Sequence, residues 1–177
     1  FSNRTITNHP SVSVDWEGDD MGTWVAGNTY TTPDLAGIVD AVIEQAGWCG
    51  GDDMAFLIEG DANLLIRAAS TYDDDPAKAP ILRVQYSEVF DGNDTGCNKR
   101  TYIIPIAQSN HDARTKSNNP TGNVNTNSGG MPMGSNGATF NNFFNIVVGL
   151  IFKVPVVEGT VINSARLEFT ATNNATE

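Results

Sequence analysis

The most regular hydrophobic pattern in the chain lies within residues 31–48. Its apolar side chains recur at spacings of three and four residues, which places them along one face of a helix: Leu35, Ile38, Val39, Val42 and Ile43. Polar or small residues occupy the opposite face. The pattern therefore predicts one amphipathic helix over residues 33–46 that packs against the rest of the protein.

Both ends of this helix carry typical signals. Thr32 is a suitable N-cap, Pro33 suits the first helical position, and Asp34 would lie at the positive end of the helix dipole. At the other end, Gly47 favours a left-handed C-terminal cap onto which Trp48 folds back. We expect the helix to cover a β-structure, because most of the remaining chain has strand or turn character.

The other apolar segments follow the two-residue period of strands or are short buried runs. The predicted strands are Ser11–Trp16, Met54–Glu59, Ile81–Tyr86, Thr101–Ile106, Val147–Val156 and Val161–Ala171. Alternation predicts three sets of side chains on common faces: Val12, Val14 and Trp16; Leu82, Val84 and Tyr86; and Ala165, Leu167, Phe169 and Ala171. This pattern predicts a mainly β fold, an antiparallel β-sandwich of jelly-roll type with one packed amphipathic helix.

The segments between these strands are turns and connectors. Residues 64–69 are expected to return as the hairpin partner of Met54–Glu59, and Pro105 favours an edge position for its strand. Residues 110–142 are rich in Asn, Gly, Ser and Thr and predict a long polar loop. A loop of that length is commonly functional or contact-making, so it is a candidate to wrap a neighbour or to carry glycans.

Composition narrows the possible partners. The chain has 21 acidic and 10 basic residues and a formal charge of −11, which argues against nucleic acid and anionic membrane surfaces. No apolar run approaches the roughly 18 residues that a membrane span needs. The chain starts at Phe1 without an initiator Met, as a processed product would. We therefore expect an extracellular or cell-surface protein.

Signatures of enzymes are poor. The two histidines, His9 and His111, stand in polar contexts without recognisable catalytic partners, and no phosphate loop, nucleophile elbow or zinc motif occurs. The sequence therefore predicts a protein that is not an enzyme and requires no cofactor. Calcium is a possible ligand, because acidic turns offer oxygen atoms at Asp73, Asp74 and Asp75 and at Asp91, Asn93 and Asp94. The alternative is that these are ordinary turns that keep a β-protein soluble.

Further features fit a secreted protein. Cys49 and Cys97 lie in Gly-containing, turn-like segments, and an even number of cysteines favours one disulfide over two free thiols. Three Asn-x-Ser/Thr triplets, at Asn3, Asn93 and Asn174, are candidate glycosylation sites.

Two stretches resemble a β-sandwich module that is repeated in secreted and surface-anchored proteins. The first is similar to the C-terminal half of that module, whose motifs are R-T-x-x-x-V-x-W, T-P-D-L-x-x-I-V, G-W-x-x-G and A-P-x-L-x-V-x-Y. The matching residues are Arg4, Thr5, Val14, Trp16, Thr32, Pro33, Asp34, Leu35, Ile38, Val39, Gly47, Trp48, Gly51, Ala79, Pro80, Leu82, Val84 and Tyr86.

The second stretch resembles the beginning of the same module, with the motifs V-G-L-x-F, P-x-G-x-x-I and A-x-L-x-F-T-A. Its matching residues are Val148, Gly149, Leu150, Phe152, Gly159, Ile162, Ala165, Leu167, Phe169, Thr170 and Ala171. The two halves therefore occur in permuted order. The resemblance implies a back half at residues 1–86, a linker at 87–99 and the front half of the next module at 100–177.

This order leaves three alternatives: complementation between neighbouring chains, pairing within one chain, or truncation of a longer tandem array. Complementation between chains would give a head-to-tail filament, because a contact that does not close into a ring propagates. The predicted assembly strands present Val148, Leu150, Phe152, Val154, Ala165, Leu167, Phe169 and Ala171. The predicted receiving core presents Val12, Val14, Trp16, Phe56, Ile58, Leu82, Val84 and Tyr86.

The expected function is therefore that of a structural subunit of an extracellular filament or cell-surface appendage, with copies of itself as partners. The alternative is a carbohydrate-binding adhesive module. Aromatic side chains stack on sugar rings when they are exposed, and Trp24, beside a Gly-containing loop, is the best candidate. Trp16 and Trp48 are expected to point inwards.

Overall fold

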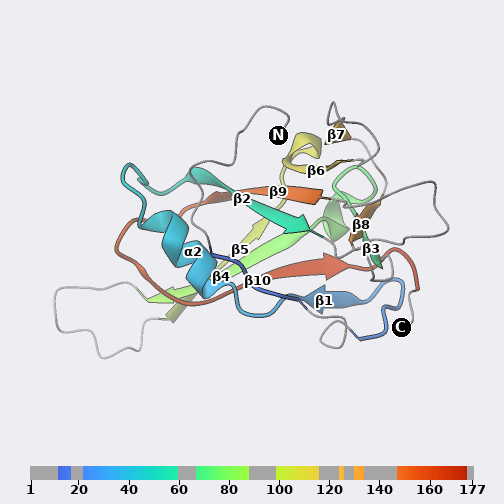
Figure 1. Cartoon of the computed structure of the whole chain (residues 1–177), viewed down its shortest axis with the longest axis horizontal. Coiled ribbons are helices and arrows are strands. Elements are labelled where there is room, and N and C mark those ends of the chain that lie inside the picture. The colour runs from blue at the N-terminus through green and yellow to red at the C-terminus, as the bar shows by residue number, and fades with distance from the viewer. Residues whose placement is uncertain are drawn as a thin grey trace.

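The computed structural model describes residues 12–16, 22–59, 67–87, 99–115, 124–125, 130–133 and 147–174. It is a mainly β structure in which antiparallel sheets pack together with one short helix (Figure 1). Several residues singled out by the sequence lie outside the described residues: Asn3, Asn93, Asp91, Asp94 and Cys97.

Two four-stranded sheets form the sandwich. The first has the order β1-β10-β4-β5 and the second the order β2-β9-β6-β7. The bounds of the first sheet's strands are β1 Thr29–Thr31, β10 Val161–Thr170, β4 Ile81–Ser87 and β5 Lys99–Pro105. Those of the second are β2 Asp52–Glu59, β9 Val147–Val154, β6 Asp112–Thr115 and β7 Val124–Asn125.

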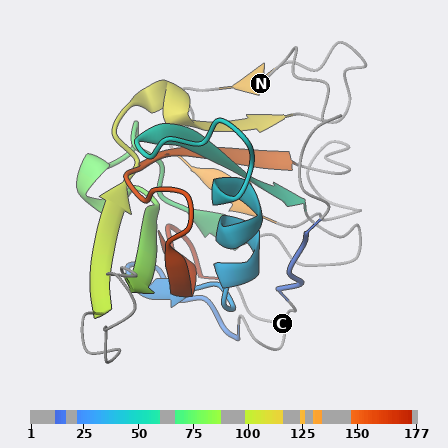
Figure 2. The same cartoon turned by 90° about the vertical axis from the view of Figure 1, so that its left-hand side faces the viewer.

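A third, two-stranded sheet lies at one end of the sandwich, where β3 (Arg67–Ala69) pairs with β8 (Met131–Met133) (Figure 1). Two single turns of 3-10 helix, η1 (Pro76–Lys78) and η2 (Ser109–His111), precede β4 and β6. Figure 2 shows the two larger sheets and the helix α2 grouped around a common interior.

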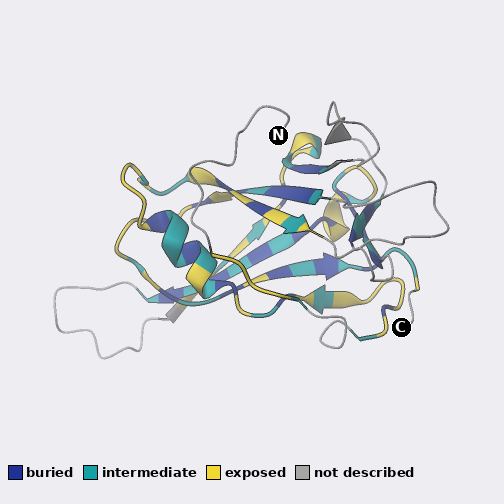
Figure 3. Ribbon diagram, in the orientation of Figure 1, coloured by how far each residue is buried: buried dark blue, intermediate teal, exposed yellow. Residues whose placement is uncertain are grey.

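The core lies between the sheets and consists of alternate side chains from their strands (Figure 3). On β4, Leu82, Val84 and Tyr86 are buried, as their alternation predicts. β10 follows the predicted pattern as well, with Ala165, Leu167 and Phe169 buried. The two-residue period therefore identified β4 and β10 of the first sheet and their inward faces correctly, whereas β1 was not predicted.

The helix α2 spans Ala36–Ile43 and is shorter than predicted. Leu35 occupies the N-cap position without a side-chain hydrogen bond, so Thr32 is not the N-cap and Pro33 is not the first helical residue. Asp34 does lie at the N-terminal end of the helix, where its carboxylate accepts from Ala36 N–H. Gly47 does adopt a positive φ of 95°, but it lies in the turn after the helix. The side chains of Val39 and Ile43 are buried in the core, which confirms the predicted apolar face.

Three predictions about strands are wrong. The extended residues 12–16 belong to no sheet in the described part, and Val12 and Val14 are 44% and 37% exposed. β2 pairs with β9, about 90 residues further along the chain, and the described residues 67–69 of its predicted hairpin partner pair with β8 instead. The predicted loop 110–142 contains three short strands, β6, β7 and β8.

Candidate assembly interface

The strands of the two halves of the chain interleave. β1, β2, β3 and β4 come from residues 22–87, and among the described residues none of them pairs with another of these four. Each pairs only with a strand from residues 99–174: β10 lies between β1 and β4, and β9 lies beside β2 (Figure 1). The main-chain hydrogen bonds of the first half's strands therefore depend on the second half.

The structure brings most of the predicted assembly and receiving residues into direct contact. On β2 and β9, Phe56 lies opposite Leu150 and Ile58 opposite Val148. On β4 and β10, Leu82 lies opposite Leu167 and Val84 opposite Ala165. All eight predicted assembly side chains are buried, and the fully buried members at the centre of the sandwich include Val148, Leu150, Val154 and Ala165. In this structure these contacts are made within one chain.

Three predicted receiving residues behave differently. Val12 and Val14 are exposed, so the structure contradicts their assignment to a receiving core. Trp16 is half-buried, and its ring stacks on Phe169 at 5.7 Å between ring centroids. Trp16 therefore joins the segment 12–16 to the second half through its aromatic ring.

The segment before α2 binds the edge of β10. The backbone N–H of Thr32 donates to the Leu167 carbonyl at 3.0 Å, and that of Leu35 donates to the Ala165 carbonyl at 2.6 Å. Pro33 lies between these donors and has no N–H. Residues 32–35 thus continue the line of β1 along β10, and we call them the β10 clasp.

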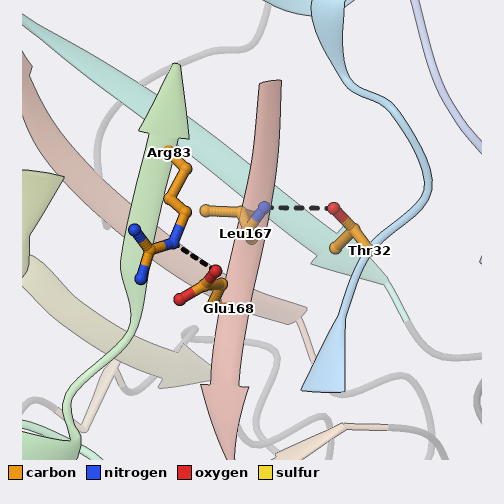
Figure 4. A network of polar contacts seen from close by, with 4 residues as sticks. All are labelled: Thr32, Arg83, Leu167 and Glu168. Carbon is orange, nitrogen blue, oxygen red and sulfur yellow. Dashed lines mark hydrogen bonds and ion pairs between the residues drawn. The ribbon is translucent and has the colours of Figure 1, made fainter. Parts of the chain in front are cut away.

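Two side chains of the β10 clasp accept hydrogen bonds that a strand's carbonyl groups would otherwise accept. Thr32 Oγ1 accepts from the N–H of Leu167 at 3.1 Å (Figure 4), and Asp34 Oδ1 accepts from the N–H of Ala165 at 2.9 Å. Asp34 Oδ1 also accepts from Ala36 N–H at 3.1 Å, at the start of the helix. The T-P-D-L sequence predicts a helix start, and in the structure Thr32 and Asp34 also join the two halves of the chain.

A charged pair adds to this contact on the outer face of the first sheet. The Arg83 guanidinium of β4 forms an ion pair with Glu168 of β10 (Figure 4). Glu168 raises the pKa of Arg83 through this hydrogen bond. Because the Arg83 side chain is 41% exposed, solvent screens the pair and its contribution to stability is modest.

Asp112 is a buried carboxylate that the sequence did not identify. It begins β6, is 3% exposed, and accepts a hydrogen bond from the N–H of Tyr72 at 2.7 Å. Burial raises the pKa of Asp112, and the charge of Asp73 raises it further, while the Tyr72 hydrogen bond and His111 oppose the shift. The ionised carboxylate therefore opposes folding.

This shift predicts a pH-dependent gain from Asp112→Asn. Folding favours the protonated carboxyl, so the penalty is absent below the ordinary pKa of 3.8 and develops as the pH rises through the higher folded-state pKa. Asparagine keeps the oxygen that accepts from Tyr72 but carries no charge. We expect urea midpoints of the variant to exceed those of the unmodified protein near neutral pH and to converge in acid. Equal differences at every pH would contradict this explanation.

The predicted calcium ligands are not gathered into a site in the described part. Asp73 and Asp74 are exposed, and Asp75 caps the η1 turn by accepting from Ala77 N–H and pairing with Lys78 at 2.9 Å. The bond to Lys78 lowers the pKa of Asp75. Within these residues no three His, Cys, Asp or Glu side chains lie close enough to hold a metal ion together.

The predicted disulfide is not formed in this structure. Cys49 is free and exposed, and its thiol lies 3.6 Å from the Gly47 carbonyl, whereas Cys97 is outside the described residues. Of the glycosylation candidates only Asn174 is described. It is exposed, and its Oδ1 accepts from Ala26 N–H at 2.8 Å.

The expected sugar-stacking residue is not accessible. Trp24 is 0% exposed and stacks on Tyr30 at 4.6 Å between ring centroids. Its role is to pack the loop before β1 against the core, so it offers no face to a glycan. Trp48 is half-buried and donates its indole N–H to the Val156 carbonyl at 2.7 Å, which ties the segment before β2 to the turn after β9.

Within the described ranges, no helix has the length and hydrophobicity required to cross a membrane. The chain matches none of the known protein families, curated proteins or solved structures with which it was compared. The resemblance to a repeated surface module therefore stays a prediction based on its motifs, and the geometry of the interleaved halves is the basis for a functional proposal.

Proposed function

We propose that this protein is a structural subunit of an extracellular filament or cell-surface appendage, in which neighbouring copies complement each other's β-sandwich. One observation carries the proposal: among the described residues, the strands β1, β2, β3 and β4 of the first half each pair with strands of the second half and not with one another. A first half alone would expose unpaired strand edges and a large apolar face, which promote association. It requires a second half, from its own chain or from a neighbour.

Exchange between copies would preserve the contacts seen within one chain. β9 and β10 of one copy would occupy the same places beside β2 and β4 of the next, with the same buried side chains. The two halves are joined through residues 88–98, which follow β4 and precede β5. Exchange of this kind is a low-cost route to oligomers, and an exchange that does not close into a ring propagates head to tail.

The composition supports an extracellular role. The formal charge of −11 disfavours nucleic acid as a partner, and the acidic, Asn-rich chain carries three glycosylation triplets. Main-chain pairing between strands supplies both affinity and register, so no cofactor is needed for assembly. The partner that this interface fits is a second copy of the same chain.

A disulfide across β2 and β9 tests the exchange. Ala55 and Ile151 lie opposite each other, and neither belongs to the buried core. Directly opposite residues in an antiparallel pair are about 4.5–5.5 Å apart between Cα atoms, which a disulfide can bridge. We would introduce Ala55→Cys and Ile151→Cys together with Cys49→Ser and Cys97→Ser, and oxidise the protein over a range of concentrations.

The two arrangements give different products on a non-reducing gel. Exchange between copies predicts a ladder of covalent oligomers that increases with concentration, together with filaments in negative-stain electron microscopy. Pairing within one chain predicts a cross-linked monomer at every concentration. A monomeric product, with compact single particles by microscopy, would overturn the proposed exchange. Ala55→Cys alone is the control for random collision.

A further inference from the structure

The strand β5 has no neighbouring strand on its outer edge among the described residues. It is the outermost strand of its sheet, and it lies at the margin of the molecule in Figure 2. The N–H of Ile106, just after β5, points towards β4, where it donates to the Pro80 carbonyl at 3.0 Å. Because these groups alternate along a strand, the N–H and C=O groups of Thr101 and Ile103 point away from β4. No described residue bonds to them.

Only part of this edge can accept another strand. Pro105 also faces away from β4 and has no N–H, so pairing would stop before it. This leaves Lys99–Ile103, a stretch of five residues. Within this stretch, the side chain of Ile103 is 55% exposed. This is the highest exposed fraction among the large apolar side chains that the structure describes. A free, apolar edge of this kind is a template for strand addition.

The segment Val12–Trp16 has complementary properties. It has no regular secondary structure and alternates between apolar and polar residues, and no hydrogen bond joins its backbone to another described residue. Val12 and Val14 are 44% and 37% exposed. The segment is held at one end, where Trp16 stacks on Phe169. It has the sequence of a strand and the same five-residue length as the free part of β5.

We infer that Val12–Trp16 of one copy adds as an antiparallel strand to the free edge of β5 in a second copy. In the register that pairs Val12 with Ile103, Val14 lies opposite Thr101. The backbone N–H and C=O groups of Thr101 and Ile103, which point away from β4, then form hydrogen bonds with the backbones of Val14 and Val12. The exposed side chains of Val12 and Ile103 cover each other. This contact is independent of the exchange of halves, because that exchange uses neither segment 12–16 nor the outer edge of β5.

Opposite charges favour this register. The register places Asp15 of one copy opposite Arg100 of the other, and both residues are exposed. β5 begins with two basic residues, Lys99 and Arg100, in a chain whose net charge is −11. The acidic end of segment 12–16 therefore faces the basic end of β5. Opposite charges at facing positions stabilise strand pairs, and like charges destabilise them.

The positions of the two surfaces determine what the contact builds. Segment 12–16 (dark blue) and β5 lie on opposite sides of the molecule in Figure 2. One chain therefore does not join its own two surfaces, and a copy bound through one surface presents the other. Such a heterologous contact propagates instead of closing as a symmetric pair. The partner is a second copy of this chain.

Cysteine cross-linking between differently marked copies tests the register. One preparation carries Val12→Cys and the other Ile103→Cys, both with Cys49→Ser and Cys97→Ser, and they are mixed and oxidised. We expect a mixed disulfide dimer as the main product. The matched control replaces Ile103→Cys by Thr101→Cys, two residues out of register, and its yield should be severalfold lower. Equal yields would overturn the register.

A backbone substitution tests strand addition itself. Ile103→Pro removes an N–H that points away from β4, so the β4–β5 ladder is retained, whereas Ile103→Ala keeps this N–H and controls for the lost side chain. We expect Ile103→Pro to weaken association, measured by sedimentation, about three- to tenfold relative to Ile103→Ala. Unchanged association would overturn the inference.

The outcomes separate this inference from the proposed exchange of halves. A Val12–Ile103 link together with only intramolecular Ala55–Ile151 disulfides would support strand addition and overturn the exchange. An Ala55–Ile151 ladder without the Val12–Ile103 link would support the exchange and overturn strand addition. A protein that stays monomeric in every experiment would overturn both.

Discussion

Phe152→Ala is expected to lower the free energy of unfolding by about 3–5 kcal/mol. Phe152 is 1% exposed and lies on β9, which pairs with β2 on one side and β6 on the other. Its ring packs edge-on against Phe56 at 6.0 Å between centroids and stands opposite Met54. Truncation removes this contact and leaves a cavity at the place where the two halves of the chain meet.

This loss is a large share of the total stability, since the free energy of unfolding of a native protein is about 5–15 kcal/mol. Urea denaturation followed by tryptophan fluorescence would measure it. Leu57→Ala is the matched control: Leu57 is on the neighbouring strand β2 but 43% exposed, so its truncation is expected to change stability by less than about 1 kcal/mol. Equal losses in the two variants would contradict the assigned core.

Asp34→Ala is expected to destabilise the protein by about 1–3 kcal/mol, because it leaves a buried N–H without an acceptor. Asp34 Oδ1 accepts from the N–H groups of Ala165 and Ala36, and Ala165 is 0% exposed. Alanine removes both hydrogen bonds and leaves the Ala165 N–H, which belongs to a fully buried residue, without this acceptor. The urea midpoint measures the effect.

Asp34→Asn separates two explanations of this residue. If Asp34 acts as an acceptor for the backbone of β10, asparagine preserves the acceptor oxygen and should retain most of the stability. If it acts through its negative charge on the helix dipole, asparagine should lose as much as alanine, and added salt should reduce the difference from the unmodified protein. The structure predicts the first result.

Alternation and helical periodicity were sufficient to predict the fold class and most of the elements. Leu82, Val84 and Tyr86 on β4, and Ala165, Leu167 and Phe169 on β10, face the core as their spacing requires. Pro105 correctly indicated an edge strand, since it has no N–H for a ladder. These signals are local, because each depends only on which side of a strand or helix a residue occupies.

Local signals failed where a distant partner decided the outcome. Thr32, Pro33 and Asp34 have the sequence of a helix start, but hydrogen bonds of the β10 clasp to Leu167 and Ala165 hold this segment against β10, and the helix begins only at Ala36. Trp24 follows a loop, yet stacking on Tyr30 buries it. Residues 12–16 alternate like a strand but have no strand beside them in the described part of the chain.

The sequence by itself determined the mainly β fold class and the inward faces of β4 and β10. Only the tertiary structure decided which strands are neighbours. β2 pairs with β9 and β4 with β10, between residues that are 74 or more positions apart in the chain. The physical reason is that a strand's period specifies its buried face but not its partner, which depends on how all apolar faces and backbone groups are satisfied together.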